Sequence, residues 1–433
     1  MRSSLGKKFI EKGTSTDIKK IYQNFSQLYI TEKFSFNGKD TVVTYVDCLD
    51  DIIDIIRNSR GLRRPWVMIG ADLGQNELLI VLSVVDQDNS KDSEDKKAVG
   101  AARSLIIGAA DCVTESTESI KFLLIEKLKL DKLKSEFVLC LDLKMVAIVT
   151  GLSDGLPKFG CPYCVSCRDR VSSARRKYKF WFREGVELRS HESNLVSFTM
   201  FQLEAGGNEK KLIKYNNVKN DPIAVLPPGD LAKPYLLYLP PEPLHLLLGV
   251  MNDVLGDLEK RFPAEMKSFC ETFHILQGDM IGGAFNGPAV KAVLQEPALV
   301  ALAQLLGVEG EDHVEYLHTV RELHILFASR SLSQNYPTII NNWKSSFRNM
   351  YENYDLSMTL KDHILYEHLE WYFTQTGLSL YFSSAEGTEA THSRFRKHKE
   401  KRQLQVRKRT GTDLHVRRHH SAVEGYNAGK FGF

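Results

Sequence analysis

Between residues 66 and 150 the chain alternates apolar runs with polar turns, a pattern that predicts short strands followed by helices. The run WVMIGAD ends at Asp72, and the run ELLIVLSVVD follows after a turn-prone stretch, so we expect two strands joined by a tight turn. A polar loop at 87–97 separates this pair from an apolar, β-tolerant segment at 98–110. The segment predicts a third strand.

A helix and a fourth strand are expected next. Apolar residues at helical spacing, preceded by Ser and Thr, predict a helix over 114–130. The run FVLCLD then predicts a short strand ending at Asp142, and 143–150 can continue as a helix. The order β-β-β-α-β-α indicates an α/β fold class with a ribonuclease-H-like core. In that plan the first and fourth strands are neighbours, so we expect Asp72 and Asp142 to lie side by side.

Two adjacent carboxylates on a rigid sheet repel one another unless a cation lies between them. Mg²⁺ binds carboxylate oxygens and water, so Asp72 and Asp142 are candidate ligands of a divalent metal ion. The alternative is that either residue merely ends a strand or caps a helix.

Beyond the fourth strand, glycine, proline and cysteine become frequent, and several amphipathic helices are expected after residue 243. We therefore expect four parts: an N-terminal helical or accessory segment, the first part of the core, a mostly helical insertion, and a C-terminal helical part of the core. Their bounds are 1–64, 65–152, 153–380 and 381–433.

The composition is typical of a globular chain. Of the 433 residues, 43% are hydrophobic and 26% are charged, which excludes the low-hydrophobicity profile of disorder. The longest apolar runs, at 78–85 and 297–308, are shorter than the roughly 20 residues that cross a bilayer, so no membrane partner is expected. The first twenty residues are polar and mixed in charge, and secretion is not expected.

Seven cysteines, three of them in one heptapeptide, indicate reduced thiols with a metal site. Cys161 and Cys164 have the spacing that zinc favours, and His363 and His368 are the best candidates for the other two ligands. Five residues correspond to about 140° on an ideal α-helix, so the helix must begin, end or be distorted there. The alternatives are packed cysteines with helix-capping histidines, or a ligand set that includes Cys167.

The positive charge is concentrated near the C-terminus. Residues 394–418 contain eleven Lys or Arg and two acids, a balance of +9 in a chain whose formal charge is +3. Such a strip predicts phosphate binding, because displaced counterions drive affinity for nucleic acid. The alternatives are a solvated basic tail or a nuclear import signal. The candidate DNA-binding residues are Arg394, Arg396, Lys397, Lys399, Lys401, Arg402, Arg407, Lys408 and Arg409.

A third carboxylate is expected on a helix after the insertion. Glu386 and Glu389 lie directly before the basic strip, and position favours Glu389. The alternative is that both acids simply stabilise a helix N-terminus.

Taken in order, these motifs resemble the catalytic core of Transib-type cut-and-paste transposases and of the V(D)J recombinase derived from them. Asp142 is followed nineteen residues later by CPYC, then by a distant HxxxxH and by a glutamate about twenty residues after it. The string AEGTEATHSRFRK is similar to the segment around that group's catalytic glutamate. ADLGQN, LPPEPLHLLLG, SSAEGTEATHSRF and RRHHSAVEGYNAGKF are also similar to segments of transposon-encoded proteins of invertebrates. The resemblance spans roughly residues 65–430.

The resemblance implies a DDE-type DNA transposase that cleaves DNA and joins 3′-hydroxyl ends by two-metal phosphodiester chemistry. It implies a catalytic triad that binds two Mg²⁺ (or Mn²⁺) ions, formed by Asp72, Asp142 and Glu389. It also implies a structural Zn²⁺ site formed by Cys161, Cys164, His363 and His368. The implied partners are double-stranded transposon ends and target DNA, with a nuclear location and a homodimer or higher oligomer.

His245 and Asn252 match positions that recur in the related proteins. ADLGQN has less glycine than its counterparts, which leaves open a decayed or host-adopted DNA-binding protein without catalysis. A metal-dependent nuclease of the same fold is a third candidate, and a zinc-stapled protein-interaction scaffold is a fourth.

Overall fold

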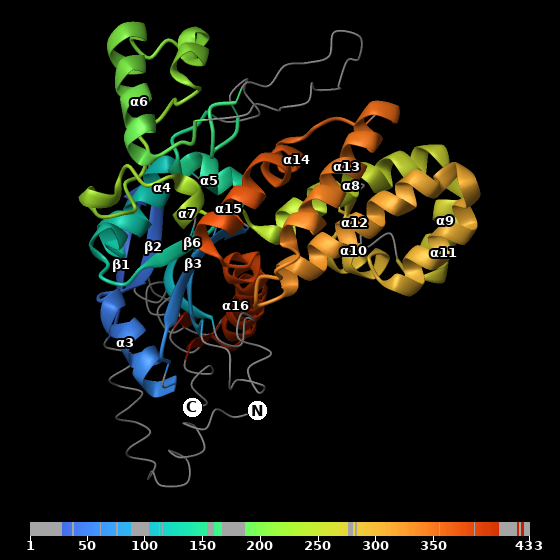
Figure 1. Ribbon diagram of the computed structural model, residues 1–433. Helices are drawn as coiled ribbons and strands as arrows, with labels where there is room; N and C mark the ends of the chain where they lie inside the picture. Colours follow the sequence, from blue (N-terminus) through green and yellow to red (C-terminus); the bar gives the residue numbers. More distant parts are fainter. Residues whose placement is uncertain are drawn as a thin grey trace.

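The computed structural model combines one mixed β-sheet with an extensive helical region beside it (Figure 1). It describes residues 28–406 together with 422–423 and 426–427. The positions left out of the first range are 37–38, 61, 75–76, 88–103, 112, 115, 154–159, 167–186, 276–279, 282–283, 355 and 385.

The sheet has six strands in the order β1-β2-β5-β4-β3-β6. Neighbouring strands are antiparallel except for β3 and β6, which pair in parallel. The strands are β1 (Tyr29–Phe36), β2 (Lys39–Val46), β3 (Pro65–Gly74), β4 (Glu77–Asp86), β5 (Leu105–Asp111) and β6 (Phe137–Cys140). The predicted three-strand meander and the adjacency of the first and fourth strands are therefore confirmed.

The predicted helices also form, although with different bounds. A capping box at Ser116 starts α4 (Thr117–Lys121), which continues as a π-helical turn at Phe122–Lys127. After β6, α5 (Leu143–Val149) begins at its N-cap Asp142. The order β-β-β-α-β-α is confirmed, and the third strand begins at Leu105 rather than at residue 98.

The segment before residue 65, expected to be helical or accessory, is only partly helical in its described residues. It contributes the β1–β2 hairpin to the sheet, and among its described residues a helix is present only at α3 (Leu49–Arg60). Tyr29–Phe36 reads YITEKFSF and Lys39–Val46 reads KDTVVTYV, and their β-branched and aromatic residues favour strands. The hairpin extends the sheet because β2 pairs with β5.

Helices pack on both faces of the sheet. Successive side chains of a strand point to opposite faces, so Gly70 and Asp72 of β3 share one face. That face receives α16 (Glu386–Val406), because a Cβ at Gly70 would lie 1.9 Å from Thr388 Oγ1. On the opposite face Leu123 of the π-helical turn lies against Gly108.

The region after β6 is mostly helical, as predicted, with one short β7–β8 pair (Met280–Ile281 and Ala284–Phe285). Figure 1 shows α6 extending away from the sheet on one side and α8 to α13 forming a bundle on the other. The helices are α6 (His191–Ala205), α7 (Tyr235–Tyr238), α8 (Pro243–Arg261), α9 (Pro263–Thr272), α10 (Gly287–Val293), α11 (Glu296–Leu306), α12 (Glu311–Ala328), α13 (Tyr336–Asn353), α14 (Leu360–His363) and α15 (Leu369–Thr376).

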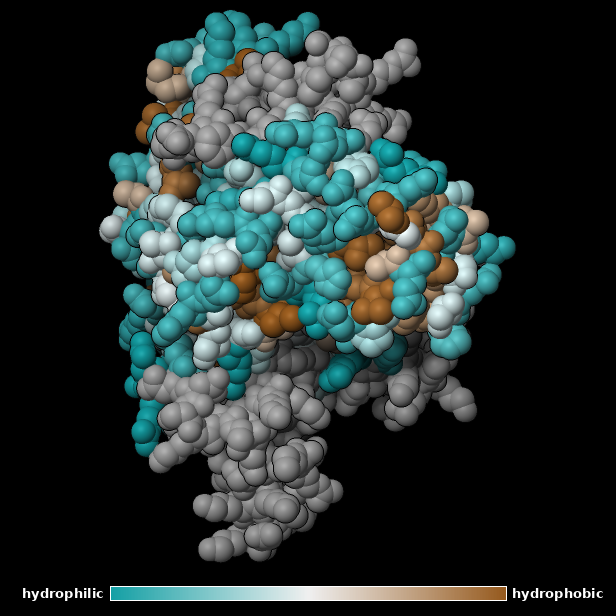
Figure 2. Space-filling view, turned by 45° about the vertical axis from the view of Figure 1, so that its right-hand side comes forward, coloured by the Kyte–Doolittle hydropathy of each residue, from teal (hydrophilic) through white to brown (hydrophobic). Residues whose placement is uncertain are grey.

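The surface of the helical bundle includes hydrophobic areas among polar side chains (Figure 2). Exposed large apolar residues of α11, α12 and the turn between them are Val300, Leu305, Val308 and Ile325. Within the described residues, no single helix is both long and apolar enough to cross a bilayer. Gly287–Val293 and Glu296–Ala328 pass that test only as a pair bent by 71°.

Candidate metal centre and carboxylate site

Cys161, Cys164, His363 and His368 form a buried cluster between the start of the insertion and its last helices. Cys161 Sγ lies 3.3 Å from His368 Nε2, and Cys164 Sγ lies 3.3 Å from His363 Nε2. All four ligand atoms are within 4.8 Å of one another. The predicted pairing of CPYC with HxxxxH is confirmed as a cluster that could bind a metal ion such as zinc, while Cys167 lies outside the described residues.

The donor set fits zinc in both chemistry and spacing. Zn–S and Zn–N bonds of about 2.3 and 2.1 Å in a tetrahedron separate a sulfur from a nitrogen by about 3.6 Å. Both observed sulfur to nitrogen distances are close to this value. The four ligand residues are buried, as the ligands of closed structural sites are.

A π-helical turn brings the two histidines together. Residues 364–368 form this turn between α14 and α15, so the backbone bonds there run from i to i+5. Side chains five positions apart then share a face, which an ideal α-helix does not allow. The predicted helix distortion between His363 and His368 is confirmed, and their rings are 5.1 Å apart.

The two thiols differ in their electrostatic environment. Burial opposes ionisation of both, but hydrogen bonds with Cys161, His363 and His368 outweigh it and hold the pKa of Cys164 well below its ordinary value. Burial and the neighbouring Cys164 raise the pKa of Cys161 well above its ordinary value. A metal ion that binds both sulfurs would therefore have to displace the proton of Cys161.

Arg189 holds the cysteine loop by hydrogen bonds to its backbone. The sequence alone did not predict this role. Its side chain is buried, and Nε donates to the carbonyl oxygens of Cys161 (3.0 Å) and Cys164 (2.9 Å). The guanidinium also donates to Asn194 Oδ1 at 3.1 Å and to the carbonyl of Asn216 at 2.8 Å. Burial lowers the pKa of Arg189, while the charges of the two cysteines act in the opposite direction.

The candidate carboxylate site starts at the ends of β3 and β6. Their parallel register pairs Gly70 with Cys140. Asp72 and Asp142 each follow two residues later, so they lie next to each other. Asp142 Oδ1 accepts from the backbone N–H of Met145 at 2.7 Å, which caps α5. The capping alternative for Asp142 is thus also correct, and it engages one of the two carboxylate oxygens.

Helix α16 brings Glu389 to the same end of the sheet. Thr388 packs on Gly70, and His392 packs on Gly74, where a Cβ would lie 2.6 Å from the imidazole. Glu389 lies about 60° around the helix axis from His392, beside the face that contacts β3. Its side chain is 40% exposed and lies at the edge of a pocket.

Asp72 has a histidine partner that the sequence analysis did not predict. His392 Nδ1 lies 2.5 Å from Asp72 Oδ2, and the histidine side chain is only 7% exposed. The contact joins the end of β3 to α16 directly. It also engages one oxygen of a candidate metal ligand.

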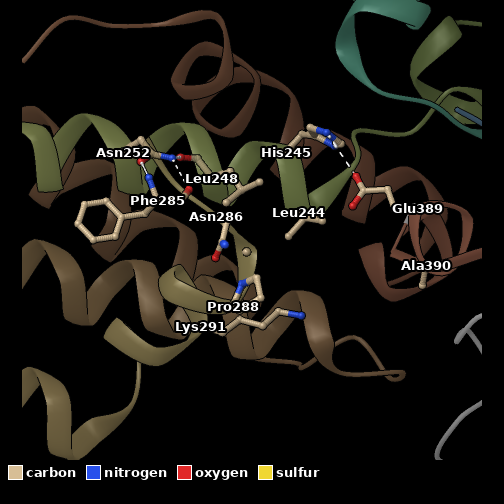
Figure 3. Close-up of a pocket in the computed structure, with 11 residues that line it drawn as sticks. Leu244, His245, Leu248, Asn252, Phe285, Asn286, Pro288, Lys291, Glu389 and Ala390 are labelled. Atoms are coloured by element: carbon tan, nitrogen blue, oxygen red, sulfur yellow. Dashed lines mark hydrogen bonds and ion pairs between the residues drawn. The ribbon is translucent and has the colours of Figure 1, made fainter. Parts of the chain in front are cut away.

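A second histidine, His245, connects Glu389 to Glu242. His245 Nδ1 lies 2.8 Å from Oε2 of the buried Glu242, and Nε2 lies 3.5 Å from Glu389 Oε1 (Figure 3). Burial opposes protonation of His245, but the charges of Glu242, Glu389 and Asp142 outweigh it and raise the pKa of the imidazole. His245 therefore lies within electrostatic reach of two of the three candidate catalytic acids.

The pocket beside Glu389 has a volume of about 680 Å³ and lies between α8, α10 and α16. Leu244, Leu248 and Pro288 contribute apolar lining, and Figure 3 shows Glu389 at one end of it. Asn252 closes the other end, where its amide bonds to the backbone N–H (2.6 Å) and carbonyl (3.1 Å) of Phe285. Asn252 thus holds β8 against α8.

Asp72, Asp142 and Glu389 do not form a tight ligand cluster. Among the described residues, the only group of three or more candidate ligand atoms within 4.8 Å of one another is the Cys2His2 cluster. The three acids are instead arranged around the shared end of β3, β6 and α16. This spacing does not fit one ion bound by all three carboxylates, whereas two ions about 4 Å apart require more widely separated ligands.

The described part of the basic strip continues along α16. Arg394 and Lys397 are exposed, and Arg396 is partly buried. Lys399, Lys401 and Arg402 also lie on α16, but their side chains are outside the described part of the chain. Arg407, Lys408 and Arg409 lie wholly outside it, as does the aromatic and basic stretch at 175–181.

The scan of the sequence against protein-family models found no match, and the search of curated proteins found none either.

Proposed function

We propose that the chain is a DDE-type DNA transposase with a ribonuclease-H-like core. The observation that carries the proposal is the parallel pairing of β3 with β6. It brings Asp72, two residues before the end of β3, next to Asp142, two residues after the end of β6. Helix α16 adds Glu389 through its contact with Gly70. Three acids from distant parts of the sequence thus lie at one end of a rigid sheet, as the resemblance implies.

The roles of the residues follow from their positions. Asp72, Asp142 and Glu389 would hold two Mg²⁺ or Mn²⁺ ions. When bound, such ions activate the attacking oxygen and stabilise the leaving oxygen of a phosphodiester. Arg394 and Lys397, exposed on the same helix as Glu389, would contact the DNA backbone. The Cys2His2 centre would bind a structural zinc ion and so hold α14 and α15 in place beside the carboxylate site.

The substrate would be double-stranded DNA, namely the ends of a transposable element and a target, and the protein would act in the nucleus as a homodimer or higher oligomer. The 3′-hydroxyl freed by hydrolysis at one phosphodiester would attack a second phosphodiester. The P–O bond to the attacking 3′-oxygen would form as the P–O bond to the leaving 3′-oxygen breaks. The attacking hydroxyl would give its proton to water, and the leaving oxygen would keep the electron pair and take up a proton.

One observation favours a second candidate function, a DNA-binding protein of the same fold without catalysis. His392 contacts Asp72 at 2.5 Å, and a carboxylate held this way is less available to a metal ion. The two functions predict different Mn²⁺ binding by the intact chain. A transposase binds Mn²⁺ through Asp72 and Asp142, whereas the second candidate binds it only after His392→Gln releases Asp72.

Cleavage of supercoiled plasmid and strand joining into a labelled duplex, both measured with Mn²⁺, test the proposal. Asp142→Asn is the most informative variant, because asparagine caps a helix as well as aspartate does and α5 should be preserved. We expect cleavage to fall by roughly 100-fold or more, as when other electrostatic groups of active sites are removed, with DNA binding retained.

Asp230→Asn, at an exposed acid of the insertion, is the matched control and should cleave like the wild-type chain. Cleavage by Asp142→Asn at the wild-type rate would disprove the triad. Breaks without joined strands would favour a nuclease of the same fold, and salt-sensitive DNA binding without cleavage would favour the second candidate. A chain with neither activity would favour a zinc-stapled interaction scaffold.

A further inference from the structure

Lys361 lies between the Cys2His2 cluster and the carboxylate site. It belongs to α14, two residues before His363, and it packs directly on α8. A Cβ at Gly249 of α8 would lie 1.9 Å from Lys361 Cδ and 2.9 Å from its Nζ. The absence of a side chain at position 249 therefore creates the space that the lysine occupies.

The packing of Lys361 against Gly249 of α8 places its ammonium near several acids. Gly249 is one helical turn after His245, which contacts Glu389, and one turn before Asp253. The carboxylates that act electrostatically on Lys361 are Asp253, Asp362, Glu242 and Asp142. Asp142 is a member of the proposed catalytic triad, so the ammonium interacts electrostatically with one of the proposed metal ligands.

Two of these four acids already have other partners. Asp362 Oδ2 accepts from the backbone N–H (2.8 Å) and the hydroxyl (2.6 Å) of Thr359 in the capping box of α14. Glu242 Oε2 accepts from the backbone N–H of His245 at 2.6 Å and lies 2.8 Å from its Nδ1. These bonds hold Asp362 and Glu242 in place.

Lys361 itself makes no ion pair within 4.0 Å in the part of the chain that the structure describes. A partly buried cation held near acids but not paired with one of them remains free to bind a further anion. At this site the available anion is a phosphate group of the DNA that Asp142 and its metal ion would act on.

We propose that Lys361 binds a phosphate oxygen of the DNA strand at the carboxylate site, and that the Cys2His2 centre positions it there through α14. The inference rests on the proposed function, since it needs DNA as the ligand. Lysine suits this role because its ammonium is a compact point charge with three donors. Because α14 carries both Lys361 and His363, the metal centre would position a residue that binds the substrate.

Lys361→Met tests the inference, because it keeps the length of the side chain and removes its charge. DNA affinity is measured by fluorescence anisotropy with a labelled duplex in Ca²⁺ over a range of salt concentrations. Loss of one phosphate contact should reduce the slope of log K against log salt by about 0.9. Lys361→Arg keeps the charge and should retain the wild-type slope.

Mn²⁺ binding gives a readout that a purely structural lysine would not change. Removal of a cation near Asp142 should strengthen Mn²⁺ binding to the DNA-free chain several-fold, measured by calorimetry. Zinc content and the thermal midpoint should stay at wild-type values. Lys344→Met is the matched control, because Lys344 is also partly buried but is paired with Glu370 at 2.8 Å.

An unchanged salt slope for Lys361→Met would overturn the inference, and so would loss of zinc together with loss of DNA affinity. The proposed function fails separately, if the wild-type chain does not cleave DNA with Mn²⁺. In that case a reduced slope for Lys361→Met would still support a phosphate contact at this position.

Discussion

Gly70 on β3 and Thr388 on α16 are in such close contact that a Cβ at position 70 would lie 1.9 Å from the threonine hydroxyl. The two residues are 318 positions apart in the sequence. Because Glu389 follows Thr388, this contact sets the depth at which the third acid approaches Asp72 and Asp142. A small residue at position 70 is thus a condition for the proposed site.

Gly70→Ala should displace α16 and lower the free energy of unfolding by about 1–3 kcal/mol, the usual cost of overpacking a core. The cleavage rate should fall by more than the loss of folded protein explains, because Glu389 moves with the helix. Urea denaturation and the plasmid assay measure the two effects. The double variant with Thr388→Ala should recover part of both, because the hydroxyl that would clash is removed.

Gly229→Ala is the control for the glycine substitution. A Cβ at position 229 would have no atom within 4 Å among those described, so the change should be within about 0.5 kcal/mol. Equal effects at positions 70 and 229 would contradict the close packing of β3 on α16.

Metal removal should destabilise the chain at the Cys2His2 centre. We expect one zinc per chain, lost on substitution of Cys161→Ser, with a fall of several kcal/mol in the free energy of unfolding, because structural zinc binding contributes directly to folding. Plasma emission spectrometry and thermal denaturation measure the two quantities. Cys48→Ser, at an exposed cysteine outside the cluster, should keep its zinc and its stability. A wild-type chain that contains no zinc would contradict the assignment of a zinc centre.

Local patterns in the sequence were sufficient to predict the core strands and both halves of the metal cluster. Strands β3, β4 and β6 are continuous apolar runs, as buried strands are, and the acids at their ends are visible in the sequence. CPYC and HxxxxH are recognisable by spacing, and the five-residue interval even predicted a distortion that the π-helical turn provides. Each signal is contained in a few consecutive residues.

Contacts between distant segments could not be predicted in this way. Arg189 and Lys361 belong to no motif, and the string AEGTEATHSRFRK contains His392 without indicating its partner. Each of the three side chains has its role only because the fold brings a remote backbone or acid next to it. The β1–β2 hairpin is different, because the β-branched and aromatic residues that favour its strands are present in the sequence. For the contact partners of the three side chains, no comparable local signal exists.

Arg189→Met should destabilise the cysteine loop strongly. Without the guanidinium, the buried carbonyls of Cys161 and Cys164 lose their donor, and two such groups cost roughly 2–5 kcal/mol. Urea denaturation measures this, and zinc release to a chelator should be faster. Arg321→Met is the control, because Arg321 is partly exposed and pairs with the exposed Glu296, an ion pair worth about 1 kcal/mol or less. Equal losses in the two variants would show that Arg189 does not hold the loop.

His191 should make the stability of the chain depend on pH. Its side chain is buried at the start of α6, Nδ1 has no hydrogen-bond partner among the described residues, and burial lowers the pKa of the imidazole. The unfolded chain then binds the proton more readily than the folded one, so stability is complete above about pH 6.5 and falls as the pH decreases below it.

His191→Gln cannot be protonated and should show a shallower decrease in urea midpoint between pH 7.5 and 5.5. His274→Gln, at an exposed histidine, tests whether loss of any imidazole has this effect. Identical pH profiles for His191→Gln and the wild-type chain would contradict the assignment.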